Sequence, residues 1–282
     1  MLFYSSIYLL LILYYNNFLT ISYTHMHTTT ALTHLGLLKI TGTDAKKFLQ
    51  GQLTCNLEEV TSSQSRVGAH CNPQGRIISL FRIFLYSENY YLQMPRELIP
   101  IAMKALQKYA VFFKITLSDA SHELYQIGYE GAIDSYPHKT DEQYTSDTHI
   151  LIKLPYALPR YLKISRANEK IFTGTIEQWK KQDILQQIPA IYPETSEKFL
   201  PHELNLPALN AVSFNKGCYT GQEIIARMQY RGKLKTKLYQ TQIETSEVVL
   251  RGKDIDTLNQ NTGTIVDYVQ IDYNHYELLV IE

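Results

Sequence analysis

The sequence predicts an α+β fold, with a body of mixed antiparallel sheets followed by a small C-terminal β-barrel domain. Helix-like and strand-like segments do not alternate in the regular order of a doubly wound sheet, and tight turns join several neighbouring strands. After Gly232, only strand-like segments occur. With 282 residues, the chain is long enough for two or three packed units.

The first predicted elements are a strand-turn-helix unit and a run of three antiparallel strands. Leu37–Thr41 is strand-like, and Gly42-Thr43-Asp44 can cap a helix that carries Phe48 and Leu49 on its apolar face. Turns at 72–75 and 87–89 then separate three strands: Arg66–Cys71, Arg76–Tyr86 and Asn89–Met94. In the middle strand, apolar residues occur at both the odd-numbered and the even-numbered positions, which point to opposite faces. We therefore expect both faces of this strand to be buried.

The centre of the chain mixes helices, strands and a polar stretch. Pro95 opens a helix that continues through Tyr109 at helical spacing. The polar stretch from Asp134 to Asp147 predicts a loop or domain edge, and a break between two subdomains near 134–149. We interpret Trp179, the only tryptophan, as a packing residue in a helix. The other predicted strands and this helix are Lys114–Leu117, Tyr125–Tyr129, Ile150–Leu154, Arg160–Ile164 and Thr175–Ile188.

A proline-rich connector, Pro189 to Pro207, leads to a cysteine in a glycine-flanked turn, Asn215–Glu223. Three features there favour a thiolate at Cys218: the charge of Lys216, the N–H groups of the following helix start, and the close backbone approach that glycines allow. Cys218 is therefore a candidate reactive thiol. Redox exchange, persulfide or cluster ligation, attack on a one-carbon adduct and a buried structural role all stay open.

The predicted helix 221–232 after this turn carries a possible ion pair. Glu223 and Arg227 are four residues apart, which favours pairing along the helix. Gln222 and Glu223 could instead bind a ligand or hold the cysteine loop in place. Three strands complete the C-terminal domain: Lys237–Ile243, Thr264–Val269 and Tyr276–Ile281.

Charge and cysteine content limit the classes of function. The formal net charge is zero, so we expect no stable nucleic-acid binding by the whole chain, and any contact with a polyanion must be local. One basic run is either a solvated surface or an anchor for a folate polyglutamate tail, a nucleic acid or an acidic partner: Arg227, Arg231, Lys233, Lys235 and Lys237.

Only three cysteines occur, and none forms a C-x-x-C pair. This content predicts a reducing, cytoplasmic setting and no metal site. We interpret Cys55 and Cys71 as core residues, because free cysteine is among the most buried residue types.

Three segments carry a family resemblance. Val212–Glu223, with Ala226-Arg227 and Arg231-Gly232, resembles the signature of the YgfZ family, the folate-binding relatives of the glycine-cleavage T protein; Thr41–Thr54 and His70–Ile77 resemble the family more loosely. The resemblance implies a folate-binding body at 26–232 and a β domain at 233–282. It also implies a monomer that binds tetrahydrofolate or a one-carbon derivative in a central cavity.

The resemblance further implies an accessory role in the assembly or repair of iron-sulfur enzymes, including those that methylthiolate tRNA. Partners would be folate and iron-sulfur enzymes or assembly proteins. Cys218 would be the functional thiol, supported by Lys216, Gly217, Tyr219, Gly221, Gln222, Glu223 and Arg227. The matching motifs place folate contacts at Gln52, Thr54, Asn72 and Arg76.

A folate-dependent aminomethyltransferase is the rival function. In the T protein an acidic pair follows the turn that matches 72–75, whereas this chain has Ser79 and Leu80 there. A hydroxyl and an alkyl group cannot replace a carboxylate that holds or moves a proton, so the sequence favours an accessory factor over this enzyme.

Residues 1–25 form an apolar extension ahead of the resemblance, which begins near Leu32. Their longest apolar run, Ile7 to Tyr15, is shorter than the roughly 20 residues that cross a bilayer, and no basic segment precedes it. We predict that the working protein starts at Met26 and that 1–25 are dispensable or reflect a misassigned start. A membrane-tethered binding protein is a weaker alternative.

Overall fold

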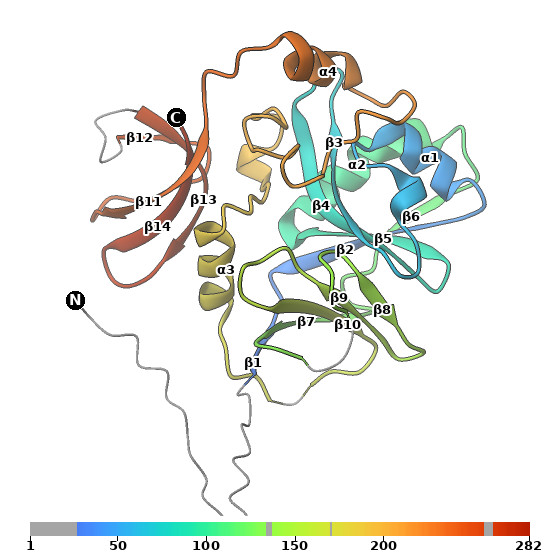
Figure 1. Cartoon of the computed structure of the whole chain (residues 1–282), viewed down its shortest axis with the longest axis horizontal. Helices are drawn as coiled ribbons and strands as arrows, with labels where there is room; N and C mark the ends of the chain where they lie inside the picture. The colour runs from blue at the N-terminus through green and yellow to red at the C-terminus, as the bar shows by residue number, and fades with distance from the viewer. Residues whose placement is uncertain (1–26, 134–136, 170, 257–261) are drawn as a thin grey trace, which may run out of the picture.

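The computed structural model describes residues 27–133, 137–169, 171–256 and 262–282. These residues form two five-stranded sheets and one four-stranded sheet, with helices packed around them (Figure 1). The predicted α+β class is confirmed. The extension 1–25 lies outside the described residues.

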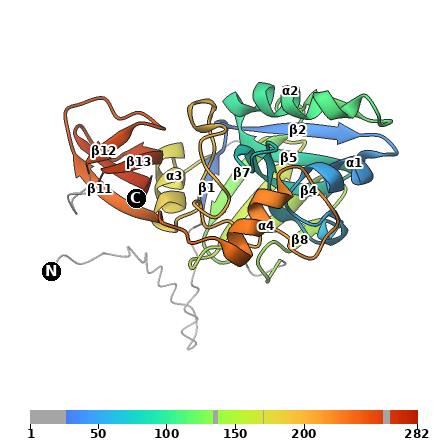
Figure 2. The ribbon, with the colours of Figure 1, turned by 90° about the horizontal axis from the view of Figure 1, so that it is seen from above.

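The first sheet holds the predicted run of three antiparallel strands. Its strands lie in the order β3-β4-β5-β2-β6, and α2 packs across β2, β4 and β6 (Figure 2). Both faces of β4 are buried, as expected, because one face meets the core beneath the helices and the other meets the second sheet. The bounds are β2 Leu35–Thr41, α1 Ala45–Gln52, β3 Arg66–Cys71, β4 Ile77–Tyr86, β5 Asn89–Pro95, α2 Ile99–Ala110 and β6 Thr116–Asp119.

The second sheet packs face to face on the first. Phe84 and Tyr91 of the first sheet share a buried cluster with Ile152 and Leu162 of the second. The strands lie in the order β1-β7-β10-β9-β8, and α3 lies beside them. Their bounds are β1 Thr28–Ala31, β7 Tyr125–Glu130, β8 Gln143–Thr145, β9 His149–Lys153, β10 Arg160–Ser165 and α3 Ile176–Leu185.

The described part of the polar stretch, 137–147, does more than form a loop. It contributes β8, and its Asp141 is buried and accepts a 2.5 Å hydrogen bond from Arg82 of β4. The change from one sheet to the other falls between Asp119 and Tyr125, ahead of this stretch. One polar residue of this stretch thus forms a buried ion pair between the two sheets.

The C-terminal sheet has the order β11-β14-β13-β12 and curls into a half barrel (Figure 1). It is joined to the body through Asp267, whose carboxylate accepts hydrogen bonds from Lys180 at 3.1 Å, Arg251 at 2.9 Å and the Tyr192 hydroxyl at 2.9 Å. The bounds here are α4 Gln222–Arg231, β11 Leu238–Glu244, β12 Asp254–Asp256, β13 Thr262–Gln270 and β14 His275–Ile281.

Two structural findings bear on function class. Among the described residues, no helix is long and apolar enough to cross a membrane, and no group of three or more His, Cys, Asp or Glu side chains is arranged to hold a metal ion. Cys55 and Cys71 are buried, as predicted. Burial raises the pKa of both thiols, to about 12 for Cys55.

Candidate functional site

Cys218 lies on an exposed loop, whereas the other two cysteines are buried. Asn215 and Gly217 are exposed beside it, and the neighbouring Tyr219 is buried. The loop therefore presents one thiol to solvent between anchored residues, and the alternative of a buried structural role for Cys218 is excluded.

The loop is tied to the chain that follows α1. The Lys216 ammonium donates to the carbonyl oxygens of Leu53 and Cys55, both at 2.8 Å. On either side, the backbone N–H of Ser213 donates to Thr54 and that of Thr220 donates to Gly51. Burial lowers the pKa of Lys216 to about 8. The Lys216 ammonium thus binds the backbone of residues 53–55. This differs from the expectation that Lys216 faces the Cys218 thiol.

The start of α4 rests on the β3–β4 turn. Gly221 has a φ of +81°, and a Cβ added there would lie 2.6 Å from the Asn72 carbonyl oxygen. A Cβ on Gly75 would meet Ile224 at 3.0 Å. Only glycines permit this approach, so the turn and the signature that the sequence separates by about 140 residues form one unit.

The polar residues of the signature differ in what they do. Gln222 Oε1 accepts from the backbone N–H of Tyr219 at 3.3 Å, so Gln222 helps to hold the loop, as one of the sequence alternatives proposed. The predicted ion pair between Glu223 and Arg227 is wrong: both side chains are exposed, and no described ion pair joins them. In water, such a pair gains too little to fix two long side chains.

Of the four predicted folate contacts, Gln52 touches the cysteine loop, Thr54 bonds the segment just before it, and the Asn72 and Arg76 side chains bond residues 197 and 198. Gln52 Oε1 accepts from the Thr220 hydroxyl at 3.3 Å. Thr54 is fully buried, and its hydroxyl donates to Ala211 O at 2.6 Å and accepts from Ala69 N at 2.8 Å. Asn72 donates to Glu197 at 2.7 Å, and Arg76 donates to the carbonyl of Lys198. Each of these side chains connects two protein segments.

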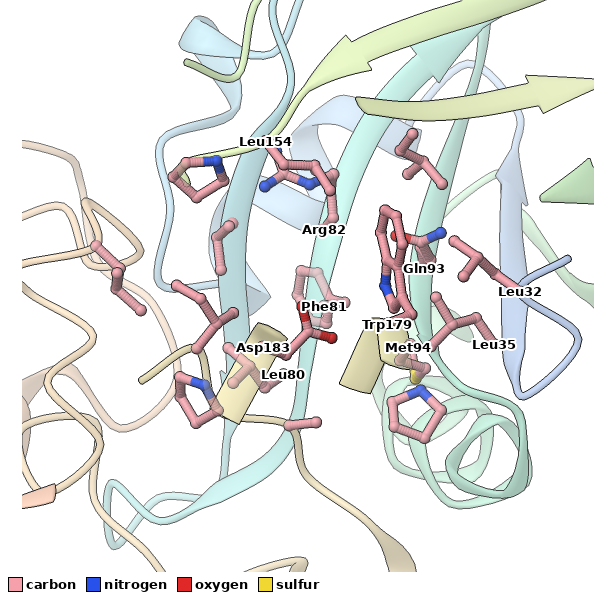
Figure 3. Close-up of a pocket in the computed structure, with 18 of the residues that line it drawn as sticks. Leu32, Leu35, Leu80, Phe81, Arg82, Gln93, Met94, Leu154, Trp179 and Asp183 are labelled. Carbon is pink, nitrogen blue, oxygen red and sulfur yellow. The ribbon is translucent and has the colours of Figure 1, made fainter. Parts of the chain in front are cut away.

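A separate cavity of about 140 Å³ lies between the two large sheets and α3 (Figure 3). Its walls are mostly apolar, and Figure 3 shows Leu80, Phe81, Trp179 and Gln93 around it. Residues 52, 54, 72 and 76 are not among those that line it. Leu80 brings an alkyl group to the cavity wall.

Asp183 is the carboxylate in this lining. Its Oδ1 accepts from Arg160 at 2.8 Å and from the Tyr156 hydroxyl. The Arg160 guanidinium lies 3.6 Å from the ring centroid of Trp179 and 4.3 Å from that of Tyr156. Burial raises the pKa of Asp183, and the charge of Arg160 opposes this shift. The Asp183 side chain keeps 25% of its surface accessible, so a ligand in the cavity can reach its carboxylate. The positive charge of Arg160 balances the negative charge of this carboxylate.

Sequence patterns do not identify Arg82, Gln93 and Asp183 as cavity residues. They come from β4, β5 and α3, and no spacing in the sequence brings these elements together. Trp179 packs against Gly128, as a packing residue should, and also forms part of the cavity wall.

One hairpin connects the cavity with the cysteine loop. Val67 of β3 and Leu80 and Arg82 of β4 line the cavity, while the turn between these strands supports Gly221. The thiol and the cavity are therefore two ends of one arrangement built on β3 and β4.

The fold resembles that of a protein of the glycine cleavage system. Glycine cleavage system aminomethyltransferase T from Bartonella henselae aligns with a TM-score of 0.65 over 90% of this chain and 78% of that chain, at 12% identity. The chain thus has the aminomethyltransferase T fold, and at this identity the likeness establishes the fold alone. No protein-family model matches the sequence.

Sequence relatives define the family. The tRNA-modifying protein YgfZ of Colwellia psychrerythraea is 36% identical over 225 residues, which cover 74% of this chain and 69% of the relative. The protein of the same name from Vibrio vulnificus is 33% identical over 223 residues, 74% of this chain and 68% of the relative. An uncharacterized Haemophilus influenzae protein is 32% identical over 249 residues, 86% and 84% of the two chains. The chain belongs to the YgfZ family of tRNA-modifying proteins.

Proposed function

We propose that this protein is a folate-binding accessory factor for the assembly or repair of iron-sulfur enzymes, including those that methylthiolate tRNA, with Cys218 as its working thiol. The observation that carries the proposal is the position of Cys218, exposed on a loop that is anchored on both sides. A thiol presented in this way suits contact with a protein client or its cluster in the cytoplasm. It acts as a monomer in this proposal.

The cavity suits the pterin ring of tetrahydrofolate or a one-carbon derivative. Apolar walls and Trp179 match a flat ring, and a carboxylate at Asp183 can accept hydrogen bonds from ring N–H groups. Gln93 donates its amide N–H to Gln126 at 2.8 Å, which leaves its carbonyl oxygen as a second acceptor in the lining. The folate would supply a carried one-carbon group. Residues 52, 54, 72 and 76 would position the cysteine loop.

An aminomethyltransferase is less well supported by the same cavity. Leu80 cannot exchange a proton, and Ser79 is buried and is not among the lining residues. Asp183 already accepts bonds from Arg160 and Tyr156, which fits a role in holding a ring more than one as a free base. Aminomethyl transfer also gives the exposed Cys218 thiol no role in the reaction.

Tryptophan fluorescence tests the folate part directly. Trp179 is the only tryptophan and lines the cavity, so tetrahydrofolate should change its emission in a saturable titration. Asp183→Asn should weaken binding by roughly tenfold or more, since hydrogen bonds to charged groups contribute about 1.5–3 kcal/mol. Asp272→Asn, at an exposed carboxylate of the C-terminal sheet, is the control and should bind normally.

Gln93→Leu removes a cavity acceptor without disturbing Arg160 and should also weaken binding. Unchanged affinity in both cavity variants, with folding verified by circular dichroism, would overturn the assignment of the cavity. For the thiol part, cells that lack this protein should regain methylthiolated tRNA only with a form that keeps Cys218.

A further inference from the structure

Five cations lie within eleven consecutive residues, a segment that we call the basic strip: Arg227, Arg231, Lys233, Lys235 and Lys237. All five side chains are exposed. Within the described part of the chain, none of them forms an ion pair with a carboxylate. No acidic residue occurs between Glu223 and Glu244, so the local charge is not neutralised along the sequence either.

The charges are arranged in a line. Arg227 and Arg231 are four residues apart on α4 and share one face of that helix. Lys233, Lys235 and Lys237 then take alternate positions in the segment that runs from α4 to β11, which Figure 1 shows crossing between the body and the C-terminal sheet. Closely spaced charges along one segment suit a ligand whose own charges repeat along a chain.

An aromatic ring lies within the strip. Tyr230 is 71% exposed, and its ring packs edge-on against Phe214 with centroids 6.1 Å apart. Phe214 lies in turn against His202. A tyrosine that is held on one edge and open to solvent can stack on an unpaired base.

Some cations elsewhere in the body pair with acids. Lys39 bonds Glu123 at 3.0 Å, and Lys46 bonds Glu58 at 2.6 Å. With a net charge of zero, the chain has as many acids as cations. Among the described residues, Glu282 lies beside Lys237 through backbone hydrogen bonds, but no carboxylate forms an ion pair with the basic strip. Like charges on one short segment repel one another. A bound polyanion offsets this repulsion.

We propose that the basic strip docks RNA, with the five cations on backbone phosphates and Tyr230 stacked on an unpaired base. The inference depends on neither the Cys218 chemistry nor the folate cavity. Five phosphate contacts are fewer than the roughly 6–10 of tightly bound complexes, so the binding is transient and sensitive to salt. It therefore agrees with the absence of net positive charge. An acidic peptide offers repeating charge but no base for Tyr230.

Fluorescence anisotropy of a labelled transfer RNA, titrated with the full chain at several salt concentrations, tests this proposal. The logarithm of affinity should fall with the logarithm of salt at a slope of about −4, which is the value for five phosphate contacts. A triple variant, Arg231→Gln with Lys233→Gln and Lys235→Gln, should reduce the steepness of this slope by about 2 to 3 and weaken binding at least roughly tenfold at low salt.

The matched control removes the same charge from another face, through Lys47→Gln, Lys104→Gln and Lys108→Gln, all exposed positions on α1 and α2. It should bind RNA as the unmodified chain does, and Tyr230→Ala should weaken binding to single-stranded RNA several-fold with the salt slope unchanged. Equal losses in the two triple variants would overturn the proposal, as would the absence of RNA binding at low salt. Equal competition by polyglutamate of matched charge would assign the strip to an acidic peptide instead.

Discussion

Gly217 and Gly221 flank Cys218 in one motif, but the structure requires a glycine at only one of them. Gly221 has a positive φ and lies against Asn72, whereas a Cβ on Gly217 would meet nothing within 4 Å. Gly221→Ala should therefore lower the free energy of unfolding by about 2 kcal/mol or more, and Gly217→Ala by less than about 0.5 kcal/mol. Urea denaturation of both variants measures the difference. Similar losses would mean that Gly221 does not carry the packing of α4 on the β3–β4 turn.

His70 is fully buried, and within the described residues neither of its ring nitrogens has a hydrogen-bond partner. Burial lowers its pKa from 6.5 to about 4. Below pH 6.5 the unfolded chain takes up a proton that the folded chain refuses until about pH 4. Folded stability is therefore fully present above pH 6.5 and falls as the pH drops towards 4, by up to about 3 kcal/mol.

His70→Leu cannot take up this proton, so its urea midpoint should fall less steeply between pH 7 and pH 4.5. Some slope should persist, because burial also lowers the pKa of His34 to about 4. Replacement of His70 should cost little at pH 7, since no hydrogen bond is lost. An unchanged slope would show that His70 is protonated in the folded protein.

At the scale of secondary-structure elements, the sequence predicts the helices and strands that have a clear local residue pattern. The residues of β4 alternate between two apolar faces, and Thr175 caps α3 through a capping box, so both elements occur close to their expected bounds. The strands that were missed, β1, β8 and β12, contain only three or four residues each. Such short segments have too few residues to show an alternation.

The candidate site was predictable only where its residues are consecutive. The cysteine motif is one continuous segment, so its exposure on a turn could be anticipated. The cavity combines Arg82, Gln93 and Asp183, whose meeting depends on how two sheets and a helix pack. Lys216 looked like a partner for the nearest thiol in sequence, but its length lets it reach carbonyl groups that are over 160 positions away in the chain.

At the scale of the whole molecule, Asp267 holds the C-terminal sheet on the body. It is 4% exposed and bonds Lys180, Arg251 and Tyr192, and the Arg251 guanidinium lies 3.6 Å from the Tyr192 ring centroid. Asp267→Ala leaves two cations without their carboxylate partner and should cost about 3–5 kcal/mol. Urea denaturation and proteolysis of the 232–237 segment measure this loss.

Glu247→Ala, at an exposed carboxylate of the same C-terminal unit, is the matched control and should change stability by less than about 0.5 kcal/mol. If both variants unfold at the same urea concentration as the unmodified protein, Asp267 does not join the two units.

The function proposed for the whole molecule depends most on one side chain, Cys218. The decisive measurement is the amount of methylthiolated adenosine in tRNA from cells that lack this protein and are complemented with the Met26 form. The form with intact Cys218 and the Gly217→Ala form should restore the modification, and Cys218→Ser should not, although it folds normally because the thiol is exposed. Full restoration by Cys218→Ser, or no loss of modification on deletion, would contradict the role of this thiol in maturing the modifying enzymes.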